Sequence, residues 1–140
     1  MKKIGYTSGV YDMFHIGHLN VIMRAKKQCD YLIVGVSTDA VVEKNKHKTP
    51  IIPFDERIAI VESIKYVDKA IPQERYDIEG KISTVMEYGI NVMFVGSDWQ
   101  GTEKWNKIEI ELAKIGCEVV YLPHTDGISS TILREKIGKK

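Results

Sequence analysis

The chain has 140 residues, which is enough for one α/β domain (residues 1–140) but too few for two independent cores. Its 20 Lys and Arg residues nearly balance 19 Asp and Glu residues, so a general nucleic-acid-binding surface is not expected. The first residues run into a predicted strand without an apolar signal segment or a bilayer-spanning run, which favours a cytoplasmic protein without membrane contact. Cys29 and Cys117 lack CxxC spacing and are expected to be reduced, packed thiols.

Short apolar runs alternate with helical patterns, which is typical of a Rossmann-like α/β fold with a parallel sheet and helices on both faces. Strands are predicted at residues 4–8, 31–37, 69–71, 92–95 and 118–122. Helices are predicted from residue 17 to about 29, from Pro53 onward, and at residues 81–88, 107–115 and 129–137. The strands at 31–37 and 92–95 are apolar at successive positions and should be central. The polar stretches 43–53 and 96–105 are predicted to be loops over a site at the carboxyl ends of the strands.

The turn after the first strand carries the strongest local signal. It begins at Ser8, Gly9 and Val10 and leads to His15 and His18 at the start of the first helix. The spacing of three residues puts both imidazole rings on one side, and the helix N-terminus adds positive potential there. Such donors suit nucleotidyl transfer, which needs positioned groups around a crowded, negative transition state but no nucleophilic side chain. The alternative is that the histidines only cap the helix and pack.

A resemblance supports the first interpretation. His15-Ile16-Gly17-His18 resembles the HxGH signature of the nucleotidyltransferase superfamily, in which Gly17 leaves room for a phosphate near the backbone. The HxGH signature alone does not determine which nucleotide base the protein binds. The run Gly127-Ile128-Ser129-Ser130-Thr131 is similar to the GISTT element in the RTEGISTT motif of glycerol-3-phosphate and choline-phosphate cytidylyltransferases. Physically it is a glycine turn followed by hydroxyls at a helix N-terminus, a second phosphate cradle.

The resemblance to bacterial glycerol-3-phosphate cytidylyltransferases covers residues 3–137. It implies a homodimer that uses CTP and Mg²⁺ to transfer CMP to a small phosphorylated alcohol, with glycerol 3-phosphate as the expected acceptor. His15 and His18 would hold the α- and β-phosphates, and Lys46, with Lys48 beside it, would close over the triphosphate. The other interpretation of residues 44–48 is a solvated loop. The distal phosphates would contact Thr125, Gly127, Ile128, Ser129, Ser130 and Thr131.

Four further residues have two interpretations each. Asp12 would orient a histidine or a water on Mg²⁺, or it would form an Asx-turn. Arg57 would contact the acceptor phosphate or hold a subunit contact. Asp98 would reach the ribose or the base, and Trp99 would either wall the pocket or belong to the core.

The chain departs from the family pattern at two cationic positions, Lys65 and His124, where the family has arginine. Arginine binds phosphate through a planar, two-pronged guanidinium group with a permanent charge. These departures therefore leave the identity of the acceptor substrate open. The alternatives are a cytidylyltransferase for another phosphate or phosphonate, an adenylyltransferase, and a CTP-sensing module without turnover.

Overall fold

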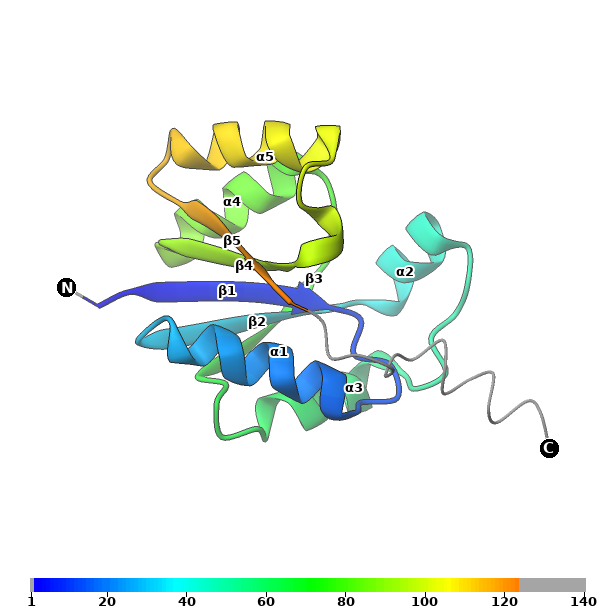
Figure 1. Ribbon diagram of the computed structural model, residues 1–140. Helices are drawn as coiled ribbons and strands as arrows, with labels where there is room; N and C mark the ends of the chain where they lie inside the picture. Colours follow the sequence, from blue (N-terminus) through cyan, green and yellow to red (C-terminus); the bar gives the residue numbers. More distant parts are fainter. Residues whose placement is uncertain (1, 124–140) are drawn as a thin grey trace.

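The computed structural model describes residues 2–123, which contain a five-stranded parallel sheet in the order β3-β2-β1-β4-β5 (Figure 1). This architecture confirms the predicted Rossmann-like α/β class. The strands are β1 (Ile4–Gly9), β2 (Tyr31–Ser37), β3 (Lys69–Gln73), β4 (Val92–Gly96) and β5 (Glu118–Leu122). The helices are α1 (Ile16–Lys27), α2 (Asp39–Lys46), α3 (Phe54–Glu62), α4 (Ile78–Tyr88), α5 (Glu103–Ala113) and the short 3-10 helix η1 (Ser97–Trp99).

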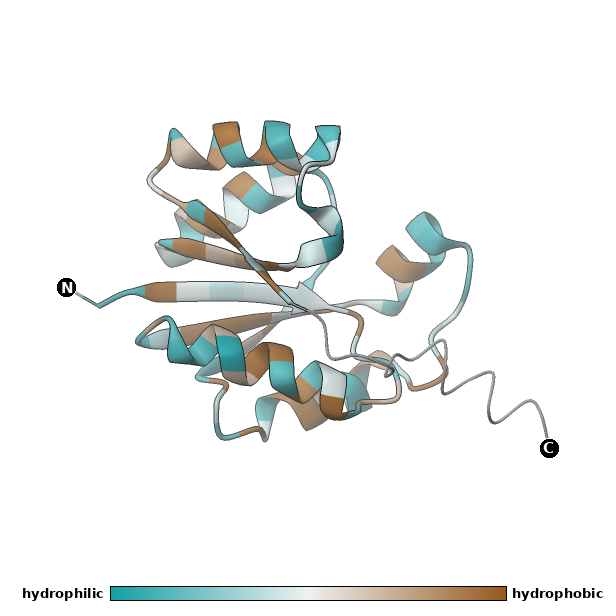
Figure 2. Ribbon diagram, viewed as in Figure 1, coloured by the Kyte–Doolittle hydropathy of each residue, from teal (hydrophilic) through white to brown (hydrophobic). Residues whose placement is uncertain are grey.

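Helices cover both faces of the sheet. Helices α1 and α3 pack on one face and α4 and α5 on the other, and each pair closes its own apolar core (Figure 1). Along β2, Leu32 and Val34 join the α1–α3 core, while Ile33 joins the α4–α5 core. Apolar and polar residues alternate along the helices (Figure 2). Strands β2 and β4 are interior as predicted, and β1 lies between them at the centre.

The carboxyl ends of β1 and β4 separate early. Strand β1 pairs with β2 from Ile4 to Gly9 but with β4 only through Gly5 and Tyr6. Beyond that point the Thr7 hydroxyl donates to the Phe94 carbonyl at 3.1 Å, where the backbone ladder has stopped. Because the chain order reverses across β1, this divergence opens a crevice at the switch point of the sheet, where open α/β folds bind ligands.

Short polar residues cap α2, which was not predicted, and start α4 and α5 earlier than the periodicity predicts. Thr38 accepts from the Val41 amide, so residues 39–46 form α2, and the prediction of a loop from residue 43 is wrong for its first part. Asp77 starts α4 in the same way, ahead of residue 81. Thr102 caps α5, which makes the end of the predicted 96–105 loop helical. No helix within residues 2–123 is both long and apolar enough to cross a bilayer.

Candidate active site

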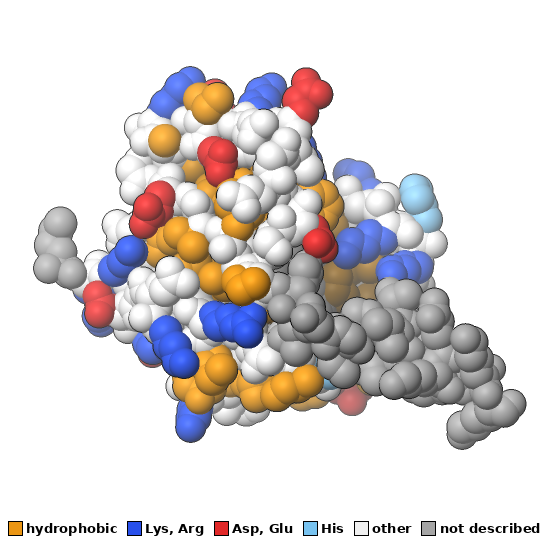
Figure 3. Space-filling view, in the orientation of Figure 1, with side chains coloured by type: hydrophobic (Ala, Val, Ile, Leu, Met, Phe, Trp, Pro, Cys, Tyr) orange, Lys and Arg blue, Asp and Glu red, His pale blue; other side chains and the backbone are white. Residues whose placement is uncertain are grey.

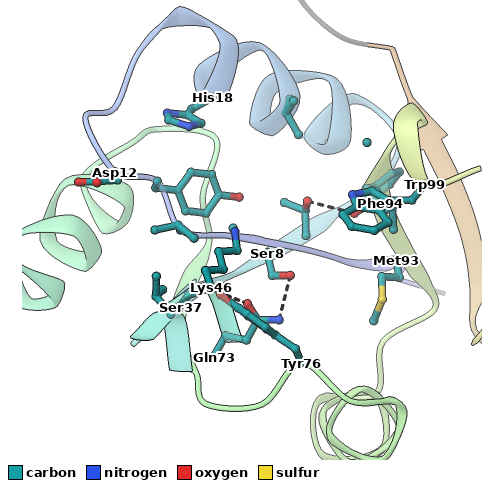
Figure 4. A pocket seen from close by; sticks show the side chains of 18 of the residues that line it. Ser8, Asp12, His18, Ser37, Lys46, Gln73, Tyr76, Met93, Phe94 and Trp99 are labelled. Carbon is teal, nitrogen blue, oxygen red and sulfur yellow. Dashed lines mark hydrogen bonds between the residues drawn. The ribbon is translucent and has the colours of Figure 1, made fainter. Parts of the chain in front are cut away.

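A pocket of about 530 Å³ lies at the carboxyl edge of the sheet, where β1 and β4 separate (Figure 4). It spans from α1 on one face of the sheet to α4 and α5 on the other. The predicted site residues that line it are Ser8, Gly9, Val10, Asp12, His18, Lys46, Lys48 and Trp99. Residues distant in sequence therefore meet at one cavity of a size typical for small-molecule sites.

The two histidines form a reciprocal cap at the start of α1. His15 Nδ1 accepts from the Gly17 amide at 3.0 Å, and His18 Nδ1 accepts from the His15 amide at 3.2 Å. The rings stack with their centroids 3.9 Å apart. A neutral imidazole whose Nδ1 accepts a hydrogen bond carries its proton on Nε2. Each ring therefore presents an Nε2–H donor, so the capping and phosphate-binding interpretations are compatible.

Burial disfavours the charged form of both imidazoles. Desolvation, followed by the neighbouring His15, lowers the pKa of His18 to about 4, against a smaller opposing effect of Asp12. Desolvation also lowers the pKa of His15. The His15 Nε2 atom is buried and has no hydrogen-bond partner within the described part of the chain. His18 is therefore a neutral, dipolar donor at pH 7 rather than a cation.

The turn that leads to these histidines has an unusual backbone. Tyr11 and Met13 have φ values of 55° and 51°, in the left-handed region that non-glycine residues rarely adopt. The buried Tyr11 ring packs edge-on against the His18 ring, with centroids 5.4 Å apart. Packing of Tyr11 thus holds a strained turn in place, as is common where a chain positions functional groups.

Asp12 links this turn to the segment that follows α2. Its Oδ2 and Oδ1 atoms accept from the amides of Ile51 and Ile52, both at 2.9 Å. These contacts reach 39 and 40 residues along the chain, so they are not an Asx-turn. Asp12 therefore fixes the end of the segment that carries Lys48.

The lysine segment reaches the pocket from α2. Lys46 is the last residue of α2, and Lys48 follows His47, which ends the helix in the left-handed region at φ 54°. Lys46 and Lys48 line the pocket, whereas Lys44 does not. Lys and Arg side chains gather over α2 at this end of the molecule (Figure 3). Lys46 and Lys48 thus bring two positively charged side chains to the pocket from the α2 side.

The structure contradicts both interpretations of Arg57. Its side chain is fully buried and donates to the carbonyls of Val10, Ser37 and Ile52 and to the Asp39 carboxylate. A guanidinium group enclosed in this way cannot meet an acceptor phosphate or a second subunit. Arg57 instead fixes the turn after β1 relative to α2.

Four other predicted contacts within residues 2–123 do not line the pocket, namely His15, Gly17, Lys65 and Asp98. Lys65 stands before β3, whose first residue, Lys69, pairs with Ile33 near the start of β2. It therefore lies at the amino edge of the sheet, opposite the pocket, with its ammonium group 5.1 Å from the Tyr66 ring centroid. Asp98 is exposed on η1 and does not line the pocket. Trp99 is 50% exposed, so it walls the pocket rather than joining the core.

Some predictions lie outside the described residues. These are the helix at 129–137 and the phosphate-binding roles of His124, Thr125, Gly127, Ile128, Ser129, Ser130 and Thr131. Gly17 is described, but its amide is engaged by His15.

A polar wall lies on the β3 side of the pocket, and apart from Ser8 its residues were not predicted from the sequence. The Tyr76 hydroxyl donates to Ser37 Oγ at 2.8 Å, the Ser37 hydroxyl donates to Gln73 Oε1 at 3.0 Å, and Gln73 Nε2 donates to Ser8 Oγ at 3.2 Å. Lys81 continues this wall. The signal was present, because Gln73 follows the predicted strand 69–71 at the same sheet edge as Ser8 and Ser37.

The described residues contain no group of three or more His, Cys, Asp or Glu side chains that could hold a metal ion.

Comparisons with known proteins agree with the pocket geometry. The chain matches the family described as Cytidylyltransferase-like over residues 6–136. It is 39% identical over 137 residues to the glycerol-3-phosphate cytidylyltransferase of Bacillus subtilis (strain 168), covering 98% of both chains. It is 39% identical over 115 residues to the FAD synthase of Archaeoglobus fulgidus, covering 81% of this chain and 79% of that enzyme. The solved lipopolysaccharide core biosynthesis protein from Thermoplasma volcanium GSS1 is similar with a TM-score of 0.72 and 27% identity, covering 89% of this chain and 98% of that chain.

Proposed function

The chain belongs to the cytidylyltransferase-like family, and we propose that it transfers CMP from CTP to glycerol 3-phosphate, giving CDP-glycerol and pyrophosphate. A phosphate oxygen of the acceptor attacks the α-phosphorus of CTP. A new P–O bond forms, and the bond between the α-phosphorus and the bridging oxygen breaks. The electron pair leaves with pyrophosphate. No covalent intermediate with the protein is needed, so catalysis consists of positioning and electrostatic stabilisation.

The paired Nε2–H groups of His15 and His18 carry this proposal. Their Nδ1 atoms are engaged by backbone amides, so the donors are fixed before substrate arrives. Preorganised donors directed at developing charge are worth about 10²–10³ in rate each. They stand at the N-terminus of α1, whose dipole favours the α- and β-phosphates of a nucleotide.

The negative charge on the rest of the triphosphate of CTP is proposed to be bound by Lys46 and Lys48, which line the pocket. Residues 125 and 127–131 remain the proposed binding site of the distal phosphates, on the strength of their motif. Mg²⁺ is proposed to arrive with the triphosphate, since the described residues offer no metal-binding cluster. When bound, it would neutralise charge on the phosphate oxygens.

Three further parts of the proposal rest on the sequence and the resemblance. They are a homodimer, a cytoplasmic location and no binding of nucleic acid. Sedimentation equilibrium tests the first, cell fractionation the second, and a gel-shift titration with duplex and single-stranded DNA the third.

Because the chain is similar to an FAD synthase, the specific alternative to CTP as the nucleotide donor is ATP. A screen of pyrophosphate release that crosses four nucleoside triphosphates with a panel of phosphorylated alcohols separates the possibilities. The proposal predicts release with CTP and glycerol 3-phosphate. Release with ATP at an equal or higher rate would indicate an adenylyltransferase, and CTP binding without release would indicate a sensor.

A further inference from the structure

Arg24 lies on α1 and connects this helix to the end of the last strand of the sheet. His18 and Val21 line the pocket, and Arg24 follows them about one turn farther along α1. Its Nη1 atom donates to the Pro123 carbonyl at 2.8 Å, a contact between residues 99 positions apart in the chain. Figure 1 shows β5 ending close to α1. The helix that begins at the two histidines therefore holds the residue that follows β5.

The end of β5 is also fixed by the sheet and by the core. Leu122, the last residue of β5, pairs with Gly96 of β4, which lines the pocket. The Leu122 side chain is buried in the same apolar core as Ile22 of α1. Proline has a fixed φ and restricts the residue before it to an extended backbone, so few conformations are open to the chain at Pro123. Packing thus brings β5 to α1, and the Arg24 bond sets the position of the Pro123 carbonyl.

Within residues 2–123, no Asp or Glu side chain forms an ion pair with Arg24. A basic residue in the last turn of a helix can instead interact with the negative end of the helix dipole. Lys27 stands in the same turn and is exposed to solvent. The Arg24 guanidinium group differs from it, because it is directed at one carbonyl group of a distant part of the chain.

The position of Pro123 matters for the proposed reaction, because the second phosphate-binding motif follows it in sequence. Thr125 is two residues beyond Pro123, and the run Gly127–Thr131 begins four residues beyond it. An extended chain spans at most about 3.6 Å per residue, so two residues span about 7 Å. The point at which Pro123 is held therefore limits which part of the pocket the proposed ligands of the distal phosphates can reach.

We propose that Arg24 is a positioning residue for nucleotidyl transfer. By holding the Pro123 carbonyl against α1, it aligns the proposed phosphate-binding residues after Pro123 with the donors of the HxGH turn. This inference rests on the proposed function and adds to it a residue that does not line the pocket. Arginine suits the role, because its guanidinium group carries several N–H donors in a fixed plane at the end of a long stem.

The test measures initial rates of pyrophosphate release, with CTP and glycerol 3-phosphate varied in turn. The proteins compared are the parent, Arg24→Met, Arg24→Lys and Lys27→Met. Methionine keeps an apolar stem but removes every donor, whereas lysine keeps the charge and can donate one hydrogen bond to a carbonyl group. Lys27→Met is the matched control, because it removes a cation from the same helix turn at an exposed residue that does not line the pocket.

Arg24→Met is expected to lower kcat/KM for CTP by about 10- to 100-fold, because a shift of about 1 Å in positioning groups costs up to about 10² in rate. The KM for glycerol 3-phosphate should stay within about twofold, since the acceptor is not held by the residues that Arg24 aligns. Arg24→Lys should recover part of the loss, and Lys27→Met should match the parent. Arg24→Met kinetics like those of Lys27→Met would overturn the inference, as would equal losses toward both substrates.

A double-mutant cycle shows whether Arg24 acts through the chain after Pro123. The second change replaces three hydroxyl side chains together, by Ser129→Ala, Ser130→Ala and Thr131→Val. If Arg24 serves to place these hydroxyls, its replacement should cost much less kcat/KM for CTP in that background than in the parent. An equal cost in both backgrounds would overturn the inference, and so would normal kinetics of the protein that lacks only the three hydroxyls.

The failure of this inference is distinguishable from that of the proposed function. A parent that releases no pyrophosphate from CTP would overturn the proposed function and the role of Arg24 with it. An active parent with an unaffected Arg24→Met variant would overturn the role of Arg24 alone.

Discussion

The Arg57 guanidinium group donates from Nη2 to Asp39 Oδ1 at 2.6 Å and joins α3 to the first turn of α2. The Arg57 side chain is fully buried, whereas that of Asp39 is 40% exposed. Arg57 also donates to three backbone carbonyls, two of which belong to Val10 and Ser37 in the pocket wall. One buried cation thus connects both helices to the site without entering it.

Arg57→Met is expected to lower the free energy of unfolding by about 3 kcal/mol, because it removes a buried charge from its partners and leaves carbonyls without donors. Urea denaturation followed by circular dichroism measures the change. The matched control is Arg75→Met, since the Arg75 ion pair with Asp77 is solvent-exposed and should contribute little. Equal effects of the two substitutions would show that Arg57 is not the structural link described.

His15→Asn separates helix capping from catalysis. Asparagine is a favourable N-cap residue, so the variant should keep most of the stability of α1, whereas His15→Ala should lose about 1 kcal/mol. Both variants lack the Nε2–H donor and should lower kcat by about 10²–10³. Denaturation and initial rates are measured on the same preparations. An asparagine variant with near-normal kcat would leave His15 as a cap only.

The lowered pKa of His18 makes stability depend on pH. Protons bind His18 more weakly in the folded state, with a pKa of about 4, than in the unfolded state, with its ordinary value of about 6.5. Between these values the unfolded state binds more protons, so the stabilisation present above pH 6.5 is lost as the pH falls toward 4. His18→Gln keeps a side chain suited to the capping box and should show a flatter profile of unfolding free energy against pH. The control is His47→Gln, because His47 is exposed, and its profile of unfolding free energy against pH should match that of the parent. Parallel profiles for the parent, His18→Gln and His47→Gln would contradict the burial of a neutral His18.

Lys46→Ala is expected to raise the KM for CTP more than Lys44→Ala does, because Lys46 lines the pocket and Lys44 does not. Steady-state kinetics with a saturating acceptor measures the difference. Indistinguishable KM values would show that residues 44–48 form a solvated surface.

Much of the fold could be predicted because each strand is a short apolar run, and β2 is apolar at successive positions. The starts of α2 and α5 were not predicted. Each is set by one hydrogen bond to a threonine side chain, Thr38 for α2 and Thr102 for α5. Hydrophobic periodicity does not reveal such a bond.

Part of the pocket lining could be predicted where the residues are close in sequence, as in the turn after β1, and the family match confirms the type of enzyme indicated. Arg57 was assigned to the acceptor phosphate or to a subunit contact because a sequence shows charge but not burial. Lys81 was missed because its relation to Tyr76 and Trp105 exists only after α4 and α5 pack together.

The most direct test of the proposed reaction is ³¹P nuclear magnetic resonance of a mixture of the protein, Mg²⁺, glycerol 3-phosphate and either CTP or ATP. The account predicts that the CTP mixture yields CDP-glycerol and pyrophosphate in equal amounts as glycerol 3-phosphate is consumed, with little change in the ATP mixture. Formation of an ADP-linked product at an equal or faster rate, or release of pyrophosphate without consumption of glycerol 3-phosphate, would contradict it.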